Sequence, residues 1–357
     1  MLREADRLIA NKVRTWLKMF HSSPMAFFRV PVSDGGLGIP SVQDIVVTGK
    51  ARLHAKLCSS ADSAIAYVAK NLLWGKEVRQ YAGRLNGFQL GGLDCGSDLS
   101  RKVKDGHRRA LQASTHCRGA ETFRDDPLGN SVITDATTKT GFIMDMVKLR
   151  TQTFPVKMAI RPTQRGNPTP YNTTCRVPEC PREESLSHVL QECPSVQGLR
   201  VKRHEVVDQQ CTKWITDKGF LTIKEPHIVS RVDGNIYKPD RLYCHPGSDT
   251  LYVLDWTVPY ETTRAAMKAS EKAKEVKYGP HLDSILLKAG ELFPDNTFTT
   301  VVLRGIAFGA RGAILPKTRE FLHTKLGMTK RSISWVQQRM VQKSIGMIKC
   351  FFAGHKE

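Results

Sequence analysis

The stretch YKPDRLYCHPGSDTLYVLDWTVPYE, from Tyr237 to Glu261, predicts the architecture of the C-terminal part of this chain. Two apolar segments, Tyr237–Cys244 and Thr250–Pro259, flank the pentapeptide His245-Pro246-Gly247-Ser248-Asp249. Pro, Gly, Ser and Asp are turn residues, so these two segments are typical of a β-hairpin. The residues on either side of Gly247 then set which positions of the two strands face each other.

The register of this hairpin brings two acidic residues together. A turn centred on Gly247 and Ser248 places Asp240 directly opposite Asp255. Carboxylates opposed on one face of a ladder lie roughly 5 Å apart at Cβ and repel each other. Asp255 is expected to be buried, because apolar or β-branched residues cover both faces of its strand. Removing either charge is therefore expected to leave the metal-free fold as stable or more stable.

A divalent cation held between Asp240 and Asp255 would relieve this repulsion. Such an ion can convert water into a nucleophile that attacks a phosphodiester. The alternatives are a surface hairpin with two solvated acids, or a different register. The pattern thus indicates a metal-ion site without excluding a purely structural pair.

A helix is expected to follow the hairpin, because Thr262-Thr263 can cap a segment that runs to about Tyr278. Lys274 and Lys277 lie near one stripe of this helix, so the helix can carry a lysine toward the acids. A lysine there would orient the attacking water or neutralise charge that develops on phosphate. The alternative is that both lysines lie on a solvated helical face.

Cysteine spacing predicts a second metal site. Cys175, Cys180, His188 and Cys193 are separated by four, seven and four residues. Three thiolates and one imidazole suit tetrahedral zinc in a closed, structural site with no open position for water. The alternatives are buried free thiols with a surface histidine, or a site in which His204 or Cys211 replaces one ligand. Zinc would stabilise a segment that is too short to build its own core.

Length and charge bound the remaining possibilities. The chain has 357 residues, which is enough for two or three domains. Its formal net charge of +20 is typical of a protein that neutralises a polyanion, most often nucleic acid. Nine cysteines on a chain without a visible signal peptide argue against a disulfide framework. No apolar run is long enough for a membrane span. Acidic membranes and acidic proteins are the alternative partners, but no single amphipathic basic helix stands out, so no membrane partner is expected.

The rest of the chain reads mainly as helices. Apolar residues at Ile9, Val13, Trp16 and Phe20 favour an N-terminal helix. A glycine-rich turn at 34–40 and a helix at 42–57 are expected to follow. Further expectations are a helix at 142–154, a basic linker at 155–170 that carries Lys157, Arg161 and Arg165, a strand at 298–309, and helices at 316–326 and 331–350.

Taken together, these segments resemble the C-terminal part of the polyprotein of site-specific non-LTR retrotransposons. This is the kind that inserts into ribosomal RNA genes and encodes a restriction-like endonuclease. The matching pieces occur in the family's order over nearly the whole chain, and the combination is specific although no single motif is. They are AFFRVPVSDGGLGIP for the end of the reverse-transcriptase thumb, FIMDMVKLRTQTFPVKMAIRPTQRG for the basic linker, the Cys-Cys-His-Cys knuckle followed by LRVKRH, then KPD, LDWTVPYE and KEVKY for the endonuclease core, and FGARGAI for its later strand.

The resemblance implies a multi-domain α+β protein with a nuclease domain of the PD-(D/E)XK type. Asp240 and Asp255 would hold Mg²⁺ or Mn²⁺, and Lys274 or Lys277 would be the catalytic lysine, because Trp256-Thr257 leaves no lysine at the usual place after the second acid. Glu261 would either assist the metal or serve only the fold. The knuckle and linker would bind nucleic acid through basic residues that include Arg200, Lys202 and Arg203.

The expected domains are a thumb remnant (1–70), a helical and basic linker (71–170), a zinc knuckle (171–204) and the endonuclease (205–357). No polymerase palm and no N-terminal DNA-binding fingers are recognisable, so the chain resembles a truncated element product. The function expected is nicking of target DNA for target-primed insertion. The expected partners are that DNA, the element RNA and a reverse-transcriptase part, in the nucleus. The alternative is an inactive fragment that binds nucleic acid.

Overall fold

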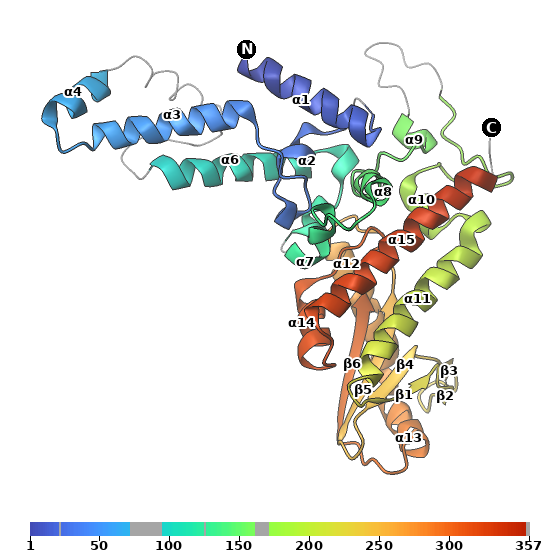
Figure 1. Cartoon of the computed structure of the whole chain (residues 1–357). Coiled ribbons are helices and arrows are strands. Elements are labelled where there is room, and N and C mark those ends of the chain that lie inside the picture. The colour runs from blue at the N-terminus through green and yellow to red at the C-terminus, as the bar shows by residue number, and fades with distance from the viewer. Residues whose placement is uncertain (21–22, 72–94, 125, 161–170, 355–357) are drawn as a thin grey trace. The chain divides into compact units, whose positions relative to one another are not determined.

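The computed structural model describes residues 1–20, 23–71, 95–124, 126–160 and 171–354 (Figure 1). The chain divides into two units, Met1–Cys117 and Arg118–Glu357. The four domains expected from the sequence are a finer division, and they stay a prediction. Within the described ranges, no helix is both long and apolar enough to cross a membrane.

The first unit is helical, as expected. Its α-helices are α1 (Leu2–Leu17), α2 (Met25–Arg29), α3 (Val42–Cys58), α4 (Ser63–Asn71) and α6 (Cys95–Gln112), with short 3₁₀ turns at Val32–Asp34 and Thr115–Cys117. The helix at 42–57 is confirmed. The first helix ends before Phe20, because Lys18 adopts a left-handed cap conformation with a φ of 51°.

One buried carboxylate holds three segments of this unit together. Asp6 of α1 accepts hydrogen bonds from Arg29 Nη2 at 2.9 Å, Ser41 Oγ at 2.7 Å and Val42 N at 2.8 Å. An acid at the first turn of α3 also suits the positive end of that helix. The glycine-rich turn lies between α2 and α3, and a Cβ at Gly36 would collide with the carbonyl of Val30.

The second unit combines helices with a mixed sheet. Its α-helices are α7 (Pro127–Asn130), α8 (Thr140–Arg150), α9 (Lys157–Ile160), α10 (Leu186–Gln191), α11 (Gln197–Thr216), α12 (Arg264–Tyr278), α13 (Leu282–Leu292), α14 (Pro316–Thr324) and α15 (Lys330–Gly354). Its 3₁₀ turns are Ala120–Phe123, Ser131–Ile133, Pro194–Val196 and Gly279–His281. Its strands are β1 (Leu221–Lys224), β2 (Ile228–Val229), β3 (Ile236–Tyr237), β4 (Arg241–Cys244), β5 (Thr250–Thr257) and β6 (Thr300–Ala307).

Four of these strands form a sheet in the order β1-β4-β5-β6. The first two pairings are antiparallel, and β5 pairs with β6 in parallel. A parallel pair needs a crossover connection, and α12 and α13 supply it. The hairpin register is confirmed, because Arg241 pairs with Leu254 and Tyr243 with Tyr252.

The expected strand at 237–244 is interrupted. Lys238, Pro239 and Asp240 belong to no strand, and Tyr237 instead pairs with Ile228 in a separate two-stranded sheet. Proline has no N–H to donate to a ladder, which explains a break at this point. Asp240 therefore lies just before the first ladder pair of β4 rather than within the strand.

Alternate residues of β5 face two separate cores. Leu251 and Val253 pack on one face with Tyr278, and with Ile285 of α13. Leu254 and Trp256 pack on the other face with apolar residues of α11, α14 and α15. Because β5 is covered on both faces, its sequence is apolar throughout rather than alternating. Asp255 has the parity of Leu251 and Val253, so it faces α12.

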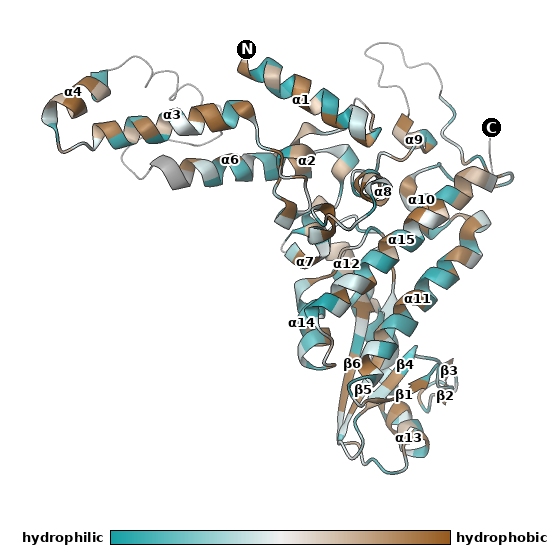
Figure 2. Cartoon of the chain, in the orientation of Figure 1, coloured by the Kyte–Doolittle hydropathy of each residue, from teal (hydrophilic) through white to brown (hydrophobic). Residues whose placement is uncertain are grey.

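Helix α15 packs beside α11 (Figure 1). It carries apolar residues along its whole length, interrupted by polar ones (Figure 2). Its first half contributes Ile333, Val336 and Met340 to the core of the sheet. Its second half contributes Ile345 and Phe351 to a core that includes the Cys175–Cys193 segment. One helix thus supports both sites that the sequence predicts.

Candidate metal centres and the acid pair

The two predicted acids lie at the same end of the β4–β5 ladder. Asp255 is 3% exposed, and Asp240 precedes β4. The backbone N–H of Trp256 donates to Asp240 Oδ2 at 2.6 Å. The Asp240 carboxylate therefore lies against the β5 backbone at the residue that follows Asp255, which is the neighbourhood that the register predicts.

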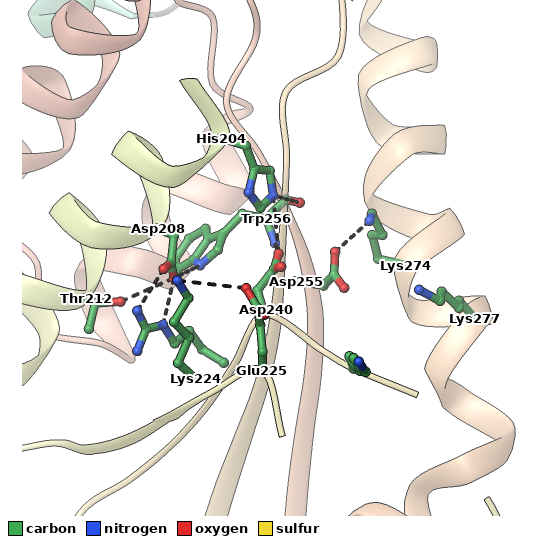
Figure 3. A network of polar contacts seen from close by, with 12 residues as sticks. His204, Asp208, Thr212, Lys224, Glu225, Asp240, Asp255, Trp256, Lys274 and Lys277 are labelled. Carbon is green, nitrogen blue, oxygen red and sulfur yellow. Dashed lines mark hydrogen bonds and ion pairs between the residues drawn. The ribbon is translucent and has the colours of Figure 1, made fainter. Parts of the chain in front are cut away.

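Asp255 is bound by two side chains of α12, Lys274 and Tyr278. Figure 3 shows the contact with Lys274. Lys274 Nζ lies 2.6 Å from Asp255 Oδ1, and the Tyr278 hydroxyl donates to Oδ2 at 2.6 Å. Burial, and next the bond to Asp255, raise the pKa of Tyr278, so its phenol keeps its proton. Thr263 caps α12 as expected, because its side chain accepts from Ala266 N.

The two candidate lysines are distinguished by their contacts. Lys274 contacts Asp255 directly, whereas Lys277 Nζ donates to the Tyr278 hydroxyl at 3.1 Å. Lys277 is thus one hydrogen bond removed from the acid. These contacts favour Lys274 among the two alternatives that the sequence left open.

Glu261 lies in a different environment. Its carboxylate is fully buried and accepts from the backbone N–H of Arg311 at 2.8 Å and of Ala313 at 3.2 Å. Arg311 Nε also donates to it at 3.3 Å. Arg311 reaches from there to the backbone carbonyl of Arg150. These partners favour the structural alternative for Glu261.

Asp240 is approached from the α11 side by a histidine (Figure 3). His204 Nε2 lies 3.4 Å from Asp240 Oδ2 and 3.0 Å from the Trp256 carbonyl oxygen. The hydrogen bond with Asp240 raises the pKa of His204. One turn later, Asp208 is bound by Arg241 Nε and Nη2 at 2.8 and 2.7 Å and by Trp256 Nε1 at 3.0 Å.

The structure brings together the four predicted zinc ligands. One ligand atom from each of Cys175, Cys180, His188 and Cys193 lies within 4.8 Å of the others. Cys175 Sγ lies 4.0 Å from Cys193 Sγ, and Cys180 Sγ lies 3.4 Å from His188 Nε2. Tetrahedral zinc with Zn–S bonds of about 2.3 Å separates two sulfurs by about 3.8 Å. The cluster could therefore hold a metal such as zinc.

Local structure explains why these four residues converge. Cys175 N donates to Arg182 O, which folds the first loop back on itself, and Ser185 caps α10 so that His188 faces the cysteines. Burial raises the pKa of the Cys175 thiol to about 12, so a nearby cation is needed to favour the thiolate. Burial lowers the pKa of His188, which favours the neutral imidazole that metals bind.

The two alternative ligands are placed elsewhere. His204 contacts Asp240, and Cys211 is fully buried in the core beneath the sheet. The knuckle also contacts other segments of the second unit. Glu184 is buried and accepts from Arg176 Nη2 at 2.8 Å and from the Lys157 backbone N–H at 2.9 Å. The knuckle is thereby tied to the segment that precedes it.

The residues predicted to bind nucleic acid differ in exposure. Arg161 and Arg165 lie outside the described residues. Lys202 is exposed, and Lys157 and Arg200 are partly buried. The prediction for Arg203 is wrong: its side chain is 2% exposed and donates to Leu190 O and Ser344 Oγ, so it binds α11 to α10 and α15.

Sequence reasoning missed three residues that contact the acids or their strands. Tyr278 closes the KEVKY motif, and it is one helical turn beyond Lys274, a spacing that could have indicated it. His204 and Asp208 share the same four-residue spacing on α11. Their target strands lie far along the chain, so helix periodicity alone could not show what they contact.

Comparison with known proteins identifies relatives of this chain. No protein-family model matches the chain. The chain is 29% identical over 348 residues to a Pol polyprotein of the type-1 retrotransposable element R2 from Popillia japonica, covering 94% of this chain and 43% of the relative. It is 28% identical over 243 residues to the corresponding protein of Nasonia vitripennis, and to that of the type-2 element R2DM of Drosophila melanogaster, in each case covering 67% of this chain.

Its homologues are R2 retrotransposon polyproteins. The resemblance predicted from the sequence is thereby confirmed. The chain spans 21% and 22% of the Nasonia and Drosophila relatives, so it corresponds to only part of each R2 polyprotein. The R2 names describe retrotransposon polyproteins as wholes, and they assign no activity to the acid pair or to the knuckle.

Proposed function

We propose that this chain is a metal-dependent DNA endonuclease of an R2-type retrotransposon, which nicks target DNA for target-primed insertion. The observation that carries the proposal is the arrangement of three side chains. Asp240 and Asp255 lie at the same end of the β4–β5 ladder, and Lys274 lies 2.6 Å from the buried Asp255. Two carboxylates and a lysine are the groups that metal-assisted phosphodiester hydrolysis uses.

The fold supports the same proposal. Helix α12 lies in the crossover from β5 to the parallel strand β6. Asp255 therefore lies on the central strand β5, Asp240 lies just before β4, and Lys274 lies on the crossover helix. A PD-(D/E)XK-type core is therefore proposed for residues 205–357. The displaced lysine agrees with the absence of a lysine two residues after Asp255.

The donor set fits Mg²⁺ or Mn²⁺. Carboxylate oxygens are the ligands that these hard cations prefer, and Mg²⁺ in particular is usually held by one or two carboxylates together with substrate phosphates. A bound ion would lower the pKa of a water molecule and stabilise charge on the phosphate. Asp240 and Asp255 would hold it.

The other side chains prepare this site. Tyr278 keeps the Asp255 carboxylate oriented through its 2.6 Å hydrogen bond. Lys274 neutralises Asp255 in the metal-free protein. With an ion held by the acids, its ammonium group would be available to a scissile phosphate. Lys277 supports the Tyr278 hydroxyl rather than the acid.

The knuckle and the net charge of +20 support a role in holding nucleic acid. We propose structural zinc at Cys175, Cys180, His188 and Cys193. Target DNA, element RNA and the remaining parts of the R2 polyprotein are the proposed partners, and the nucleus is the proposed location because the target is chromosomal.

A plasmid-nicking assay tests the proposal. The purified chain is incubated with supercoiled plasmid and Mg²⁺ or Mn²⁺, beside Asp240→Asn and Asp255→Asn. The wild type should produce open circles, and both variants should be inactive because the ion loses a ligand. Equal nicking by all three proteins would exclude this site. Plasmid binding without nicking by the wild type would instead support an inactive nucleic-acid-binding fragment.

A further inference from the structure

His204 is the one histidine among the described residues that contacts either acid. Its Nε2 atom faces two acceptors, the Trp256 carbonyl oxygen at 3.0 Å and Asp240 Oδ2 at 3.4 Å. A carbonyl and a carboxylate cannot donate, so Nε2 must carry a proton to interact favourably with both. The imidazole is therefore a donor directed at the edge of the acid pair.

A donor of this kind can fix the orientation of the Asp240 carboxylate. Asp240 follows Pro239 and precedes the ladder of β4, so strand pairing does not fix its side chain. Its Oδ2 atom is held by the Trp256 backbone N–H at 2.6 Å and is approached by His204. Both contacts use the same oxygen. Within the described residues, Oδ1 has no hydrogen-bond partner, which leaves it for an ion.

Helix α11 fixes the position of His204 on both sides. One turn before it, Arg200 Nη1 donates to the Cys193 carbonyl of the knuckle at 2.7 Å. One turn after it, Asp208 binds Arg241 and the indole of Trp256. One turn further, Thr212 hydrogen-bonds the hydroxyl of Tyr243 at 2.7 Å. The four-residue spacing places all of these contacts on one stripe of the helix.

We propose that His204 is a positioning residue for the metal ion of the acid pair, acting by orienting the Asp240 carboxylate from the helix that follows the zinc knuckle. This inference rests on the proposed nuclease function. Hydrogen bonds to metal-binding carboxylates orient them, and their loss typically lowers metal affinity or activity about 10- to 100-fold. The same helix contacts Cys193 O, so the knuckle and the acid pair share one rigid support.

The test compares His204→Ala, His204→Gln and a matched control, His227→Ala. His227 is an exposed histidine in the loop between β1 and β2. For each of these proteins, Mn²⁺ binding is measured by titration calorimetry, and nicking is measured over a range of Mn²⁺ concentrations. Zinc content and the thermal midpoint are recorded beside them.

His204→Ala should weaken Mn²⁺ binding and raise the half-saturating Mn²⁺ concentration by about tenfold or more. The maximal nicking rate at saturating Mn²⁺ should change less, and zinc content should stay at the wild-type value. His204→Gln should recover part of the affinity, because its amide N–H replaces the Nε2–H donor. A general loss of stability would not produce this recovery.

Two results would overturn the inference. The first is a His204→Ala protein with the Mn²⁺ affinity and half-saturation of His227→Ala. The second is a His204→Gln protein as weak as His204→Ala. If the wild type binds Mn²⁺ through Asp240 but does not nick, the nuclease function fails while the calorimetry still decides the role of His204. If the wild type binds no Mn²⁺ at all, both proposals fall.

Discussion

The ion pair between Lys274 and Asp255 makes a prediction about stability that reverses the expectation from the sequence. Repulsion between two acids predicts that loss of either charge would stabilise the metal-free protein. In the structure, however, Asp255 already has a cation and a phenol as partners. Removing its charge should therefore destabilise the fold, and removing the cation should destabilise it more.

The two substitutions differ because the two side chains differ in exposure. The Asp255 side chain is 4% exposed, whereas that of Lys274 is 29% exposed. In Asp255→Asn, the lysine can turn to water and the amide oxygen still accepts from Tyr278, so the cost should be about 1 kcal/mol. In Lys274→Met, a buried carboxylate loses its cation and cannot reach water, so the cost should be about 3 kcal/mol.

Thermal unfolding in buffer without Mg²⁺ or Mn²⁺ measures the difference. For a unit of this size, 1 kcal/mol corresponds to about 2–4 °C in Tm. Asp255→Asn should thus lower Tm by about 2–4 °C and Lys274→Met by about 6–12 °C. The double variant should be more stable than Lys274→Met alone, because no buried charge is left unpaired.

Lys272→Met provides the control on the same helix. The Lys272 side chain is 69% exposed, so its loss should change stability by less than about 0.5 kcal/mol. If Lys274→Met is no more destabilising than Lys272→Met, the buried pair does not exist as described. If Lys274→Met and Asp255→Asn are equally destabilising, the argument from exposure is wrong.

Four further predictions follow from other contacts. Lys274→Ala should lower the nicking rate on the order of 100-fold and Lys277→Ala less than 10-fold, because of these two lysines only Lys274 contacts Asp255. Single-turnover kinetics measure the two rates, and equal losses would contradict the prediction. About one zinc ion should copurify per chain, and Cys180→Ser should lose it, as measured by atomic emission. Cys180→Ser should also lower the Tm of the whole second unit in calorimetry, because the knuckle shares a core with α15. A variant that keeps its full zinc content would exclude the site. Affinity for duplex DNA should fall steeply as the salt concentration rises. Lys202→Ala should reduce the slope of log affinity against log salt concentration by about 0.9 if this exposed lysine contacts one phosphate. An unchanged slope would show that Lys202 contacts no phosphate. Burial raises the pKa of Glu271, so its contribution to stability is lost as pH rises through the folded pKa; Glu271→Gln should therefore flatten the pH dependence of unfolding in that range, and an unchanged profile would contradict this.

Local sequence determined the elements and the ligands. Turn residues around Gly247 set the register of β4 and β5, because a hairpin leaves its two strands only one pairing for a given turn. Thr263 and the spacing that follows it defined α12, because capping and helix periodicity act within a few residues. The four candidate ligands of the knuckle could be found for the same reason: they lie within one short segment, and their spacing is a property of the sequence.

Tertiary structure decided which side chains serve those elements. Arg203 and Lys202 are adjacent basic residues, yet one is buried against Leu190 and Ser344 and the other is exposed, because only packing determines which side of α11 is covered. Glu261 looked like a candidate metal ligand until Arg311, 50 residues further along the chain, was seen to bind it. His204 and Tyr278 likewise reach the acids from α11, which precedes the sheet, and from α12, which connects β5 to β6. Contacts of this kind depend on how distant segments pack, and no local pattern encodes them.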